Sequence, residues 1–318
     1  MRSLHVAVAG GGLGGLALAR GLLRTGADVT VYERDASLVT RRQGYRLHLD
    51  ARAGLALDAL LPPESFALFQ ATCAQPSRRL TVTTERLRVR REQVADNRGV
   101  DPYAPATLST SVDRQTFREV LAAGLASRIA FGHELVRFRT PPQALGLTPA
   151  QDYLMWALAG DRQCFGVPDT ELTALDPAGL HALSAGLIRT WHSDLRALHA
   201  AADVDQTFAI RVRTSPAVPA WPPSRVTVLG DAIHAMSPAR GSGANTALQD
   251  AALLSRMLDT AATDGSGVVA AIGDYERQMR EYGYAAVAAS RQAEAQTGAR
   301  RSRLLFWLYR RLVHRGRW

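Results

Sequence analysis

The sequence predicts an α/β protein built on a Rossmann-like parallel sheet with a smaller mixed sheet beside it. An apolar run at residues 5–10 meets a cluster of glycines, then a helical pattern, then a second strand at residues 28–35. Downstream, an apolar run ending in Gly230-Asp231 is followed by a glycine-bearing turn and another helical pattern. Two strand–turn–helix units of this kind are typical of nucleotide-binding α/β folds.

The first glycine cluster has the spacing of a dinucleotide-binding turn. Gly10 suits the tight turn, Gly12 lets the backbone approach a pyrophosphate, and Gly15 lets helix and strand pack closely. The helix N-terminus supplies unpaired N–H groups for phosphates. Glu33, at the end of the second strand, can accept both hydroxyls of an adenosine ribose. The motif favours a dinucleotide site over a turn that merely packs, but alone it does not separate FAD from NAD.

The middle of the chain predicts separate short elements. Residues 47–50 read as a strand followed by a helix through Leu60, and residues 78–91 as a strand or hairpin of a different sheet. Asp113 is placed to cap a helix through Leu125. Further strands are expected at 128–138, 153–159, 207–214 and 225–231, and helices at 176–202, 245–258 and from 273 onward.

The second cluster places an acid at the edge of the sheet. Asp231 follows a strand expected to run parallel to the first, so its carboxylate should lie at the carboxyl edge, where it can accept hydrogen bonds from a polyol. Gly241 and Gly243 permit close backbone approach at the N-terminus of the helix that contains Asn245, and that helix end favours negative charge. The alternative to a ligand-binding turn is an ordinary capped helix after a strand, with no ligand.

Three stretches together carry a family resemblance: VAVAGGGLGGLALA…VYERD, DRQTFREVL and WPPSRVTVLGDAIHAMSPARGSGANTALQDA. The chain resembles the class A FAD-dependent aromatic hydroxylases, the p-hydroxybenzoate hydroxylase-like flavoprotein monooxygenases, and within them the branch acting on aromatic polyketides. The resemblance implies FAD as cofactor, NAD(P)H as co-substrate and hydroxylation of an aromatic small molecule with O2. It supplies no catalytic side chain.

The resemblance also assigns site residues. The ADP half of FAD would be held by Gly10, Gly12, Gly15 and Glu33, the flavin linker by Arg114, and the ribityl chain by Asp231. The residues expected to line the isoalloxazine are Pro238, Gly241, Gly243 and Asn245. Arg42 matches a family arginine near the phosphates or the incoming NAD(P)H.

One family segment is missing. The family carries a strand ending in Asp-Gly between the first strand and the Gly-Asp strand, whereas here the only Asp-Gly is Asp264-Gly265, beyond the second cluster. Its loss leaves two strands with unpaired backbone groups. Three outcomes are open: residues 153–159 insert between the two strands as a replacement, the two strands pair directly with each other, or the core is left incompletely packed. A catalytically impaired or non-catalytic flavin-binding member is therefore the alternative function; an NAD(P)-dependent dehydrogenase would leave the second cluster unexplained.

These patterns divide the chain into three parts. The FAD-binding domain is expected over residues 1–72, 100–130 and 215–280, a reduced substrate domain over 73–99 and 131–214, and a C-terminal helical segment over 281–318. His234 is expected to be an ordinary residue with no acid or base role, and the tryptophans, Trp156 among them, are expected to be packing residues.

Composition limits the classes of binding partner that the chain is expected to have. Apolar residues at 47% and charged residues at 21% describe a globular protein, and two distant cysteines without metal-ligand spacing predict a reduced, cytoplasmic setting and no metal. Of the 38 basic residues, all arginine, seven lie in residues 300–318, so the charge of +9 is weak evidence for nucleic acid. That tail is expected to pack across the protein, with an anionic membrane surface as the alternative. The oligomeric state stays open.

Overall fold

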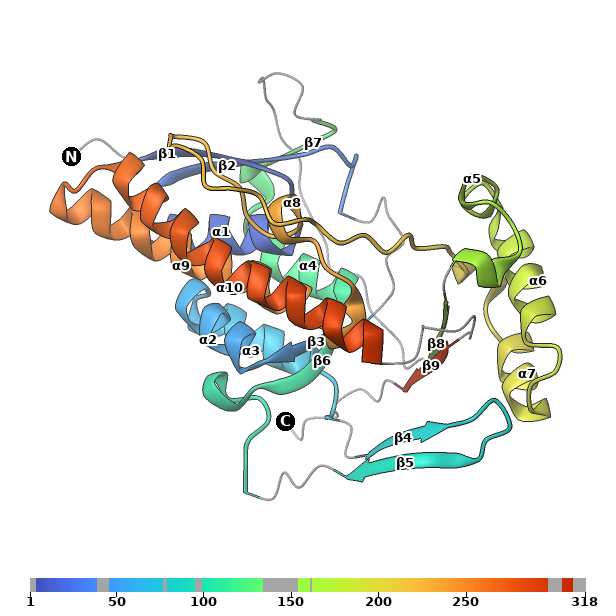
Figure 1. Cartoon of the computed structure of the whole chain (residues 1–318). Helices are drawn as coiled ribbons and strands as arrows, with labels where there is room; N and C mark the ends of the chain where they lie inside the picture. Colours follow the sequence, from blue (N-terminus) through green and yellow to red (C-terminus); the bar gives the residue numbers. More distant parts are fainter. Residues whose placement is uncertain are drawn as a thin grey trace.

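The computed structural model describes residues 4–38, 46–76, 79–94, 99–133, 154–160, 162–296 and 305–310. A small parallel sheet and a layer of packed helices form its largest part, while short helices and two of the two-stranded sheets, β4–β5 (Arg79–Thr83 and Val89–Val94) and β8–β9 (Leu154–Ala159 and Leu305–Arg310), lie apart from them (Figure 1). Within the described residues, no helix is both long and apolar enough to cross a bilayer.

The parallel sheet has the order β1-β2-β7. β1 (His5–Ala9) pairs with β2 (Asp28–Glu33), and β2 pairs with β7 (Ile129–Phe131), both in parallel. Helix α1 (Leu13–Arg24) connects β1 to β2, which confirms the predicted strand–turn–helix–strand unit.

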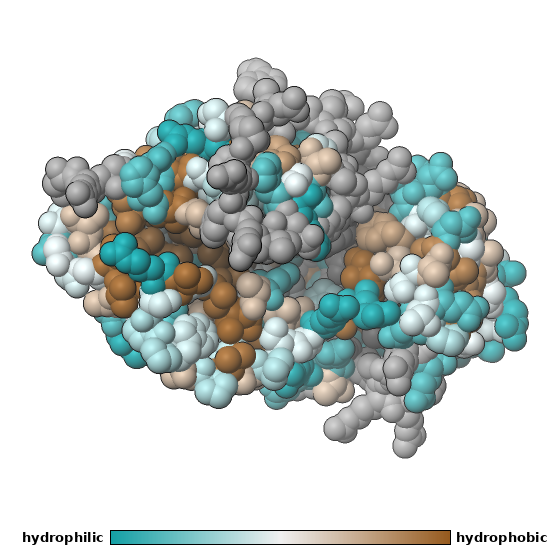
Figure 2. All heavy atoms as spheres, turned by 90° about the horizontal axis from the view of Figure 1, so that it is seen from above, coloured by the Kyte–Doolittle hydropathy of each residue, from teal (hydrophilic) through white to brown (hydrophobic). Residues whose placement is uncertain are grey.

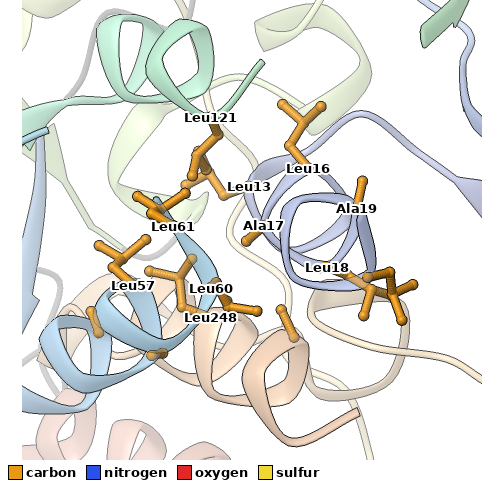
Figure 3. Packing of buried hydrophobic residues seen from close by; sticks show 14 of the residues in the cluster. Leu13, Leu16, Ala17, Leu18, Ala19, Leu57, Leu60, Leu61, Leu121 and Leu248 are labelled. Atoms are coloured by element: carbon orange, nitrogen blue, oxygen red, sulfur yellow. The ribbon is translucent and has the colours of Figure 1, made fainter. Parts of the chain in front are cut away.

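The core lies between α1 and three other helices: α2 (Ala51–Leu60), α9 (Gly243–Asp264) and α10 (Val268–Gln296). Figure 3 shows leucines of α1 meeting those of α2, α4 and α9. Leu16, Leu57 and Leu248 have no exposed surface. Burying one such side chain contributes roughly 1.5–3 kcal/mol, so this helix layer holds most of the stabilising apolar surface.

Glycines let α1 approach its neighbours more closely than any other residue would. A Cβ on Gly15 would lie 2.1 Å from the carbonyl oxygen of Gly10, and one on Gly21 would lie 2.3 Å from Leu60 Cδ2 and 2.6 Å from Ser255 Oγ. Helix α1 is therefore locked against β1 on one side and against α2 and α9 on the other.

Two-stranded sheets complete the chain. β3 (Arg46–Asp50) pairs antiparallel with β6 (Ser109–Asp113), which leads into α4 (Arg114–Ala122). Asp113 Oδ1 accepts the Thr116 N–H at 2.9 Å, so the predicted cap is confirmed. β4 (Arg79–Thr83) and β5 (Val89–Val94) form the predicted separate hairpin.

The other elements are α3 (Pro63–Thr72), α5 (Asp169–Leu172), α6 (Pro177–Leu187), α7 (Ser193–Ala200), α8 (Asp231–His234) and the 3-10 turns Pro105–Thr107, Ala126–Arg128, Arg162–Phe165, Val204–Gln206 and Pro238–Arg240.

Several expected strands are wrong. Residues 207–214 and 225–230 form no strand, and Asp231 begins the short helix α8 instead of ending a strand. β8 (Leu154–Ala159) does not enter the parallel sheet, because it pairs antiparallel with β9 (Leu305–Arg310). In the expected C-terminal helical segment, residues 281–296 continue helix α10, whereas residues 305–310 form β9 and not a helix. Residues 297–304 and 311–318 of that segment, and residues 134–138, lie outside the described ranges.

The close approach of α1 can be tested with a matched pair of glycine substitutions. We expect Gly21→Ala to lower the free energy of unfolding by about 1–3 kcal/mol, because the added methyl overpacks the contact with Leu60 and Ser255. Gly186→Ala on α6 adds a methyl that meets nothing within 4 Å and should be neutral or stabilising by up to about 1 kcal/mol. Urea unfolding measures both, and equal effects of the two variants would contradict the packing described.

Candidate cofactor site

The N-terminus of α1 is an open set of backbone donors. Gly10 has a φ of +108°, which lets the chain turn sharply after β1. Gly12 is the N-cap and offers no side-chain acceptor, and the first turn carries no acidic residue. Both Gly10 and Gly12 line a cavity, and a Cβ atom added to either would meet nothing within 4 Å. The turn therefore leaves room for a group lying against the backbone, and anions are the groups that a helix N-terminus favours.

The Gly-Asp turn is fixed by a buried carboxylate on α9. Gly230 has a φ of +63°, and its N–H donates to Asp250 Oδ2 at 2.7 Å. Asp231 follows at the start of α8, exposed and lining the same cavity. The carboxylate of Asp231 thus projects from a turn whose position Asp250 holds.

The N-terminus of α9 is a second open helix end. Gly241, with a φ of +61°, reverses the chain after the turn Pro238–Arg240, and Ser242 caps α9 without a side-chain hydrogen bond. Pro238, Gly241 and Gly243 line the cavity.

Asn245 has a different place from the one expected. It is 1% exposed and does not line the cavity. Its Nδ2 donates to the carbonyl oxygens of His48 at 3.0 Å and Gly241 at 2.9 Å, and its Oδ1 accepts the Asp50 N–H at 2.9 Å. Asn245 therefore ties α9 to β3 and to the turn before it, and forms the support of the cavity wall.

A single cavity of about 2830 Å³ joins the two clusters. Its lining includes the predicted residues Gly10, Gly12, Gly15, Arg114, Asp231, Pro238, Gly241 and Gly243. Two glycine turns separated by more than 200 positions thus open into one space. Arg46 and Arg240, which the sequence analysis did not single out, line it as well and add positive charge. Predicted Arg42 lies outside the described residues.

Glu33 is buried behind the glycine turn rather than open to the cavity. Its Oε2 accepts the Gly11 N–H at 2.8 Å and Arg118 Nη2 at 2.9 Å, and its Oε1 accepts the Asp35 N–H at 3.0 Å. A carboxylate has about four acceptor positions. Groups of the protein itself take three of these positions, so Glu33 holds the glycine turn in place.

Arg118 is the partner that sequence reasoning missed. It is 6% exposed, and its Nε donates to the carbonyl oxygen of Gly11 at 2.7 Å while Nη1 donates to that of Leu38 at 3.0 Å. One turn of helix separates it from Arg114, so both arginines of DRQTFREVL face this end of the protein. An arginine four residues after a predicted site arginine was the available signal.

His234 belongs to a buried polar network behind the Gly-Asp turn. Its Nε2 lies 2.6 Å from Asp250 Oδ2, and the Tyr282 hydroxyl donates to Asp250 Oδ1 at 2.6 Å. Burial lowers the pKa of His234, but the hydrogen bond and charge of Asp250 outweigh it, so the pKa lies above its ordinary value. Burial, together with Asp250, raises the pKa of Tyr282.

FAD fits this arrangement. Space beside Gly10 and Gly12, two helix ends without acidic or side-chain caps, arginines on the walls and an exposed carboxylate at Asp231 match an extended ligand with a pyrophosphate and a polyol.

Comparison with known proteins leads to the same cofactor. A family model described as an FAD binding domain matches residues 184–290. The dual O-methyltransferase/FAD-dependent monooxygenase CTB3 of Cercospora beticola is 27% identical over 392 residues, which cover 87% of this chain and 44% of CTB3. This chain therefore spans less than half the length of that relative.

Solved structures share the fold. A protein of Photorhabdus luminescens subsp. laumondii TTO1, assigned as an FAD-containing monooxygenase, superposes with a TM-score of 0.72 at 25% identity, covering 92% of this chain and 98% of that one. Klebsiella pneumoniae HpxO, solved with FAD and uric acid, gives a TM-score of 0.66 at 19% identity, covering 91% and 87%. At the latter identity the likeness concerns the fold alone.

Fold, cavity and family match together define an FAD-binding protein with a Rossmann-like sheet. More particularly, the chain is similar to FAD-dependent monooxygenases, as the sequence resemblance to the class A family indicated.

The His234 network predicts a pH dependence of stability. Because its pKa is raised in the folded protein, protonation of His234 stabilises the fold; this contribution is complete below pH of about 6.5, the ordinary value, and is lost as the pH rises through the raised pKa. The difference in Tm between the unmodified protein and His234→Gln should therefore be largest near pH 6 and shrink toward alkaline pH. Asp250→Asn should abolish the same dependence. A difference that stays constant with pH would show that His234 does not titrate in this way.

Proposed function

We propose that this protein is an FAD-dependent monooxygenase that hydroxylates an electron-rich aromatic small molecule, of the polyketide kind, with NAD(P)H and O2. The observation that carries the proposal is the shared cavity of the glycine turn at Gly10–Gly15 and the turn at Asp231–Gly243. Since the chain spans less than half of CTB3, the activity of such relatives is a hypothesis for this chain.

Each part of the cavity has a role in this proposal. The N–H groups at the start of α1 would bind the pyrophosphate, Asp231 would accept hydrogen bonds from the ribityl chain, and Arg114 would contact the linker. Pro238, Gly241 and Gly243 would lie against the flavin ring. Bound FAD would supply the electron transfer from NAD(P)H to O2, and the chain's own contribution is to bind, orient and enclose.

The opposite wall of the cavity suits a flat apolar substrate. Met155, Trp156, Phe165, Leu180 and Leu187 line it. The Trp156 ring also packs against His199, with ring centroids 4.6 Å apart, which supports its reading as a packing residue while leaving it on the wall. Solved structures with this fold hold small molecules, uric acid in HpxO and 2-aminobenzoylacetate in PqsL of Pseudomonas aeruginosa. An aromatic ring would be held here by stacking and apolar contact.

A second candidate is a flavin-binding member without hydroxylation. The volume of the cavity favours it, because about 2830 Å³ far exceeds the roughly 300–1,000 Å³ of ordinary small-molecule sites, and a cavity of this size would admit water to the reacting groups. For both candidates we propose a cytoplasmic location, consistent with two free cysteines, Cys73 and Cys164.

Spectroscopy separates these functions. The purified protein is expected to be yellow with a flavin spectrum, and addition of NADPH in air should consume NADPH. Consumption without peroxide in the presence of an aromatic acceptor supports hydroxylation, whereas a yellow protein that is inert toward both NADPH and NADH supports the second candidate. A colourless protein that takes up no FAD would refute both.

The role of Asp231 can be measured directly. We expect Asp231→Ala to weaken FAD binding by roughly 10- to 100-fold, since a hydrogen bond to a charged group is worth about 1.5–3 kcal/mol. Asp259→Ala, an exposed carboxylate elsewhere on α9 that does not line the cavity, should leave the dissociation constant unchanged. Flavin fluorescence titration gives both values, and an unaffected Asp231→Ala would remove this residue from the site.

A further inference from the structure

Two serine hydroxyl groups are buried without a hydrogen-bond partner in the part of the chain that the structure describes, those of Ser237 and Ser290. Ser237 is 2% exposed, and Ser290 has no exposed surface. Such a group loses its hydrogen bonds to water on folding and gains none in return, so native proteins rarely contain one. The two serines differ in one respect: Ser237 lines the cavity, whereas Ser290, on α10, does not.

Ser237 stands where a serine normally caps a helix. It is the N-cap of the 3-10 turn Pro238–Arg240, and an N-cap serine usually accepts a backbone N–H of the turn that follows it. The side chain of Ser237 makes no such bond. Rotation about the Cα–Cβ bond gives a serine hydroxyl three staggered positions. Because the hydroxyl of Ser237 would break no hydrogen bond of the protein on rotating, it is available to a molecule bound in the cavity.

The backbone that carries Ser237 is held on both sides. On one side, the Ala235 carbonyl accepts the Ser215 N–H at 2.8 Å. On the other side, the Gly241 carbonyl accepts Asn245 Nδ2 at 2.9 Å. The fold therefore fixes the position of the serine before a ligand binds, and such preorganisation lowers the entropic cost of binding.

Ser237 has no competitor for a polar group of a ligand in this stretch of the cavity wall. Between Asp231 and Arg240, the residues that line the cavity are Ala232, Ala235, Met236, Ser237, Pro238 and Ala239. Ser237 is the one member of this set with a polar side chain. Hydrophobic residues also gather around a hollow on the face of the molecule that Figure 2 shows. A ligand with a polar edge would therefore find its side-chain partner here in Ser237.

We propose that the Ser237 hydroxyl binds FAD, through a hydrogen bond to the polar edge of the flavin ring. Ser237 directly precedes Pro238 and the turn to which the ring is assigned in the proposed function, whereas the pyrophosphate is assigned to the turn at Gly10–Gly15. The flavin ring carries carbonyl oxygens and ring nitrogens along one edge, and a serine hydroxyl can both donate and accept. This contact rests on the FAD binding in the proposed function and does not depend on hydroxylation.

Replacement of Ser237 by alanine distinguishes a ligand contact from a structural role. Ser237→Ala removes a buried hydroxyl that bonds to nothing, so the Tm of the FAD-free protein should stay the same or rise by a few degrees. FAD binding, in contrast, should weaken by roughly 2- to 10-fold, which corresponds to the loss of one hydrogen bond between neutral groups. At saturating FAD, the visible absorption band of the bound flavin should also shift, because the lost bond is one to the ring. Flavin fluorescence titration and absorption spectra measure the two effects.

Ser290→Ala is the matched control. It removes an equally buried and unpartnered hydroxyl from α10, away from the cavity, so the Tm should respond in the same way while FAD affinity and the flavin spectrum stay unchanged. Unchanged FAD affinity and spectrum in Ser237→Ala would overturn the proposal. A clear fall in the Tm of FAD-free Ser237→Ala would also overturn it, since the hydroxyl would then serve the fold.

The unmodified protein separates this contact from the proposed function. If it binds FAD and Ser237→Ala binds FAD equally well, the contact is refuted and the proposed function stands. If the unmodified protein takes up no FAD, both are refuted. If Ser237→Ala shows the expected loss of affinity in a protein that hydroxylates nothing, the contact stands without the proposed reaction.

Discussion

The direct contact of the α1 backbone with β1 and with its helical neighbours is the constraint on which the rest of the structure depends. Gly15 brings the helix against the Gly10 carbonyl, and Gly21 brings it against α2 and α9. Because Gly14 and Gly21 carry no side chain where they meet Ala247 and Ser255, α1 and α9 lie side by side, and both present their N-termini to one cavity (Figure 1). Residues remote in the chain become one site because two helices can approach this closely.

Buried polar groups hold the loops that this packing leaves free. Arg118 and Glu33 fix the first glycine turn, Asp250 and His234 fix the Gly-Asp turn, and Asn245 fixes the turn before α9. Each uses a side chain from an element packed behind the cavity. Removing one partner of such a buried pair leaves an uncompensated polar group and is strongly destabilising, so these residues preserve the shape of the site without lining it.

Local sequence signals predicted the elements that local interactions determine. The glycine turn with β1, α1 and β2, the Asp113 cap of α4 and the β4–β5 hairpin follow from backbone conformation, capping and alternation, which neighbouring residues specify. Residues 207–214 and 225–231 alternate like strands but form none, because a strand also requires a partner with free backbone groups. The pairing of β8 with β9 joins segments about 150 positions apart, and no local pattern encodes that choice.

For the candidate site, too, the sequence predicted the features that local motifs determine and missed those that depend on tertiary packing. The residues that contact the cavity through glycine turns or helix ends were predictable, since motif spacing places them. Glu33 and Asn245 were assigned to ligand contact, yet both are turned toward their own chain by Arg118 and by β3, which only the packed structure reveals. Arg118 lies in the same stretch, DRQTFREVL, one helical turn after Arg114, the residue to which the resemblance assigned a role.

The central claim is that one FAD molecule engages both helix N-termini at once. Amide hydrogen exchange of the full chain, recorded with and without FAD, measures this most directly. The account predicts that FAD slows exchange together at the first turn of α1, residues 13–15, and at the first turn of α9, residues 243–244. Protection confined to one of these helix ends, or to neither, would contradict it.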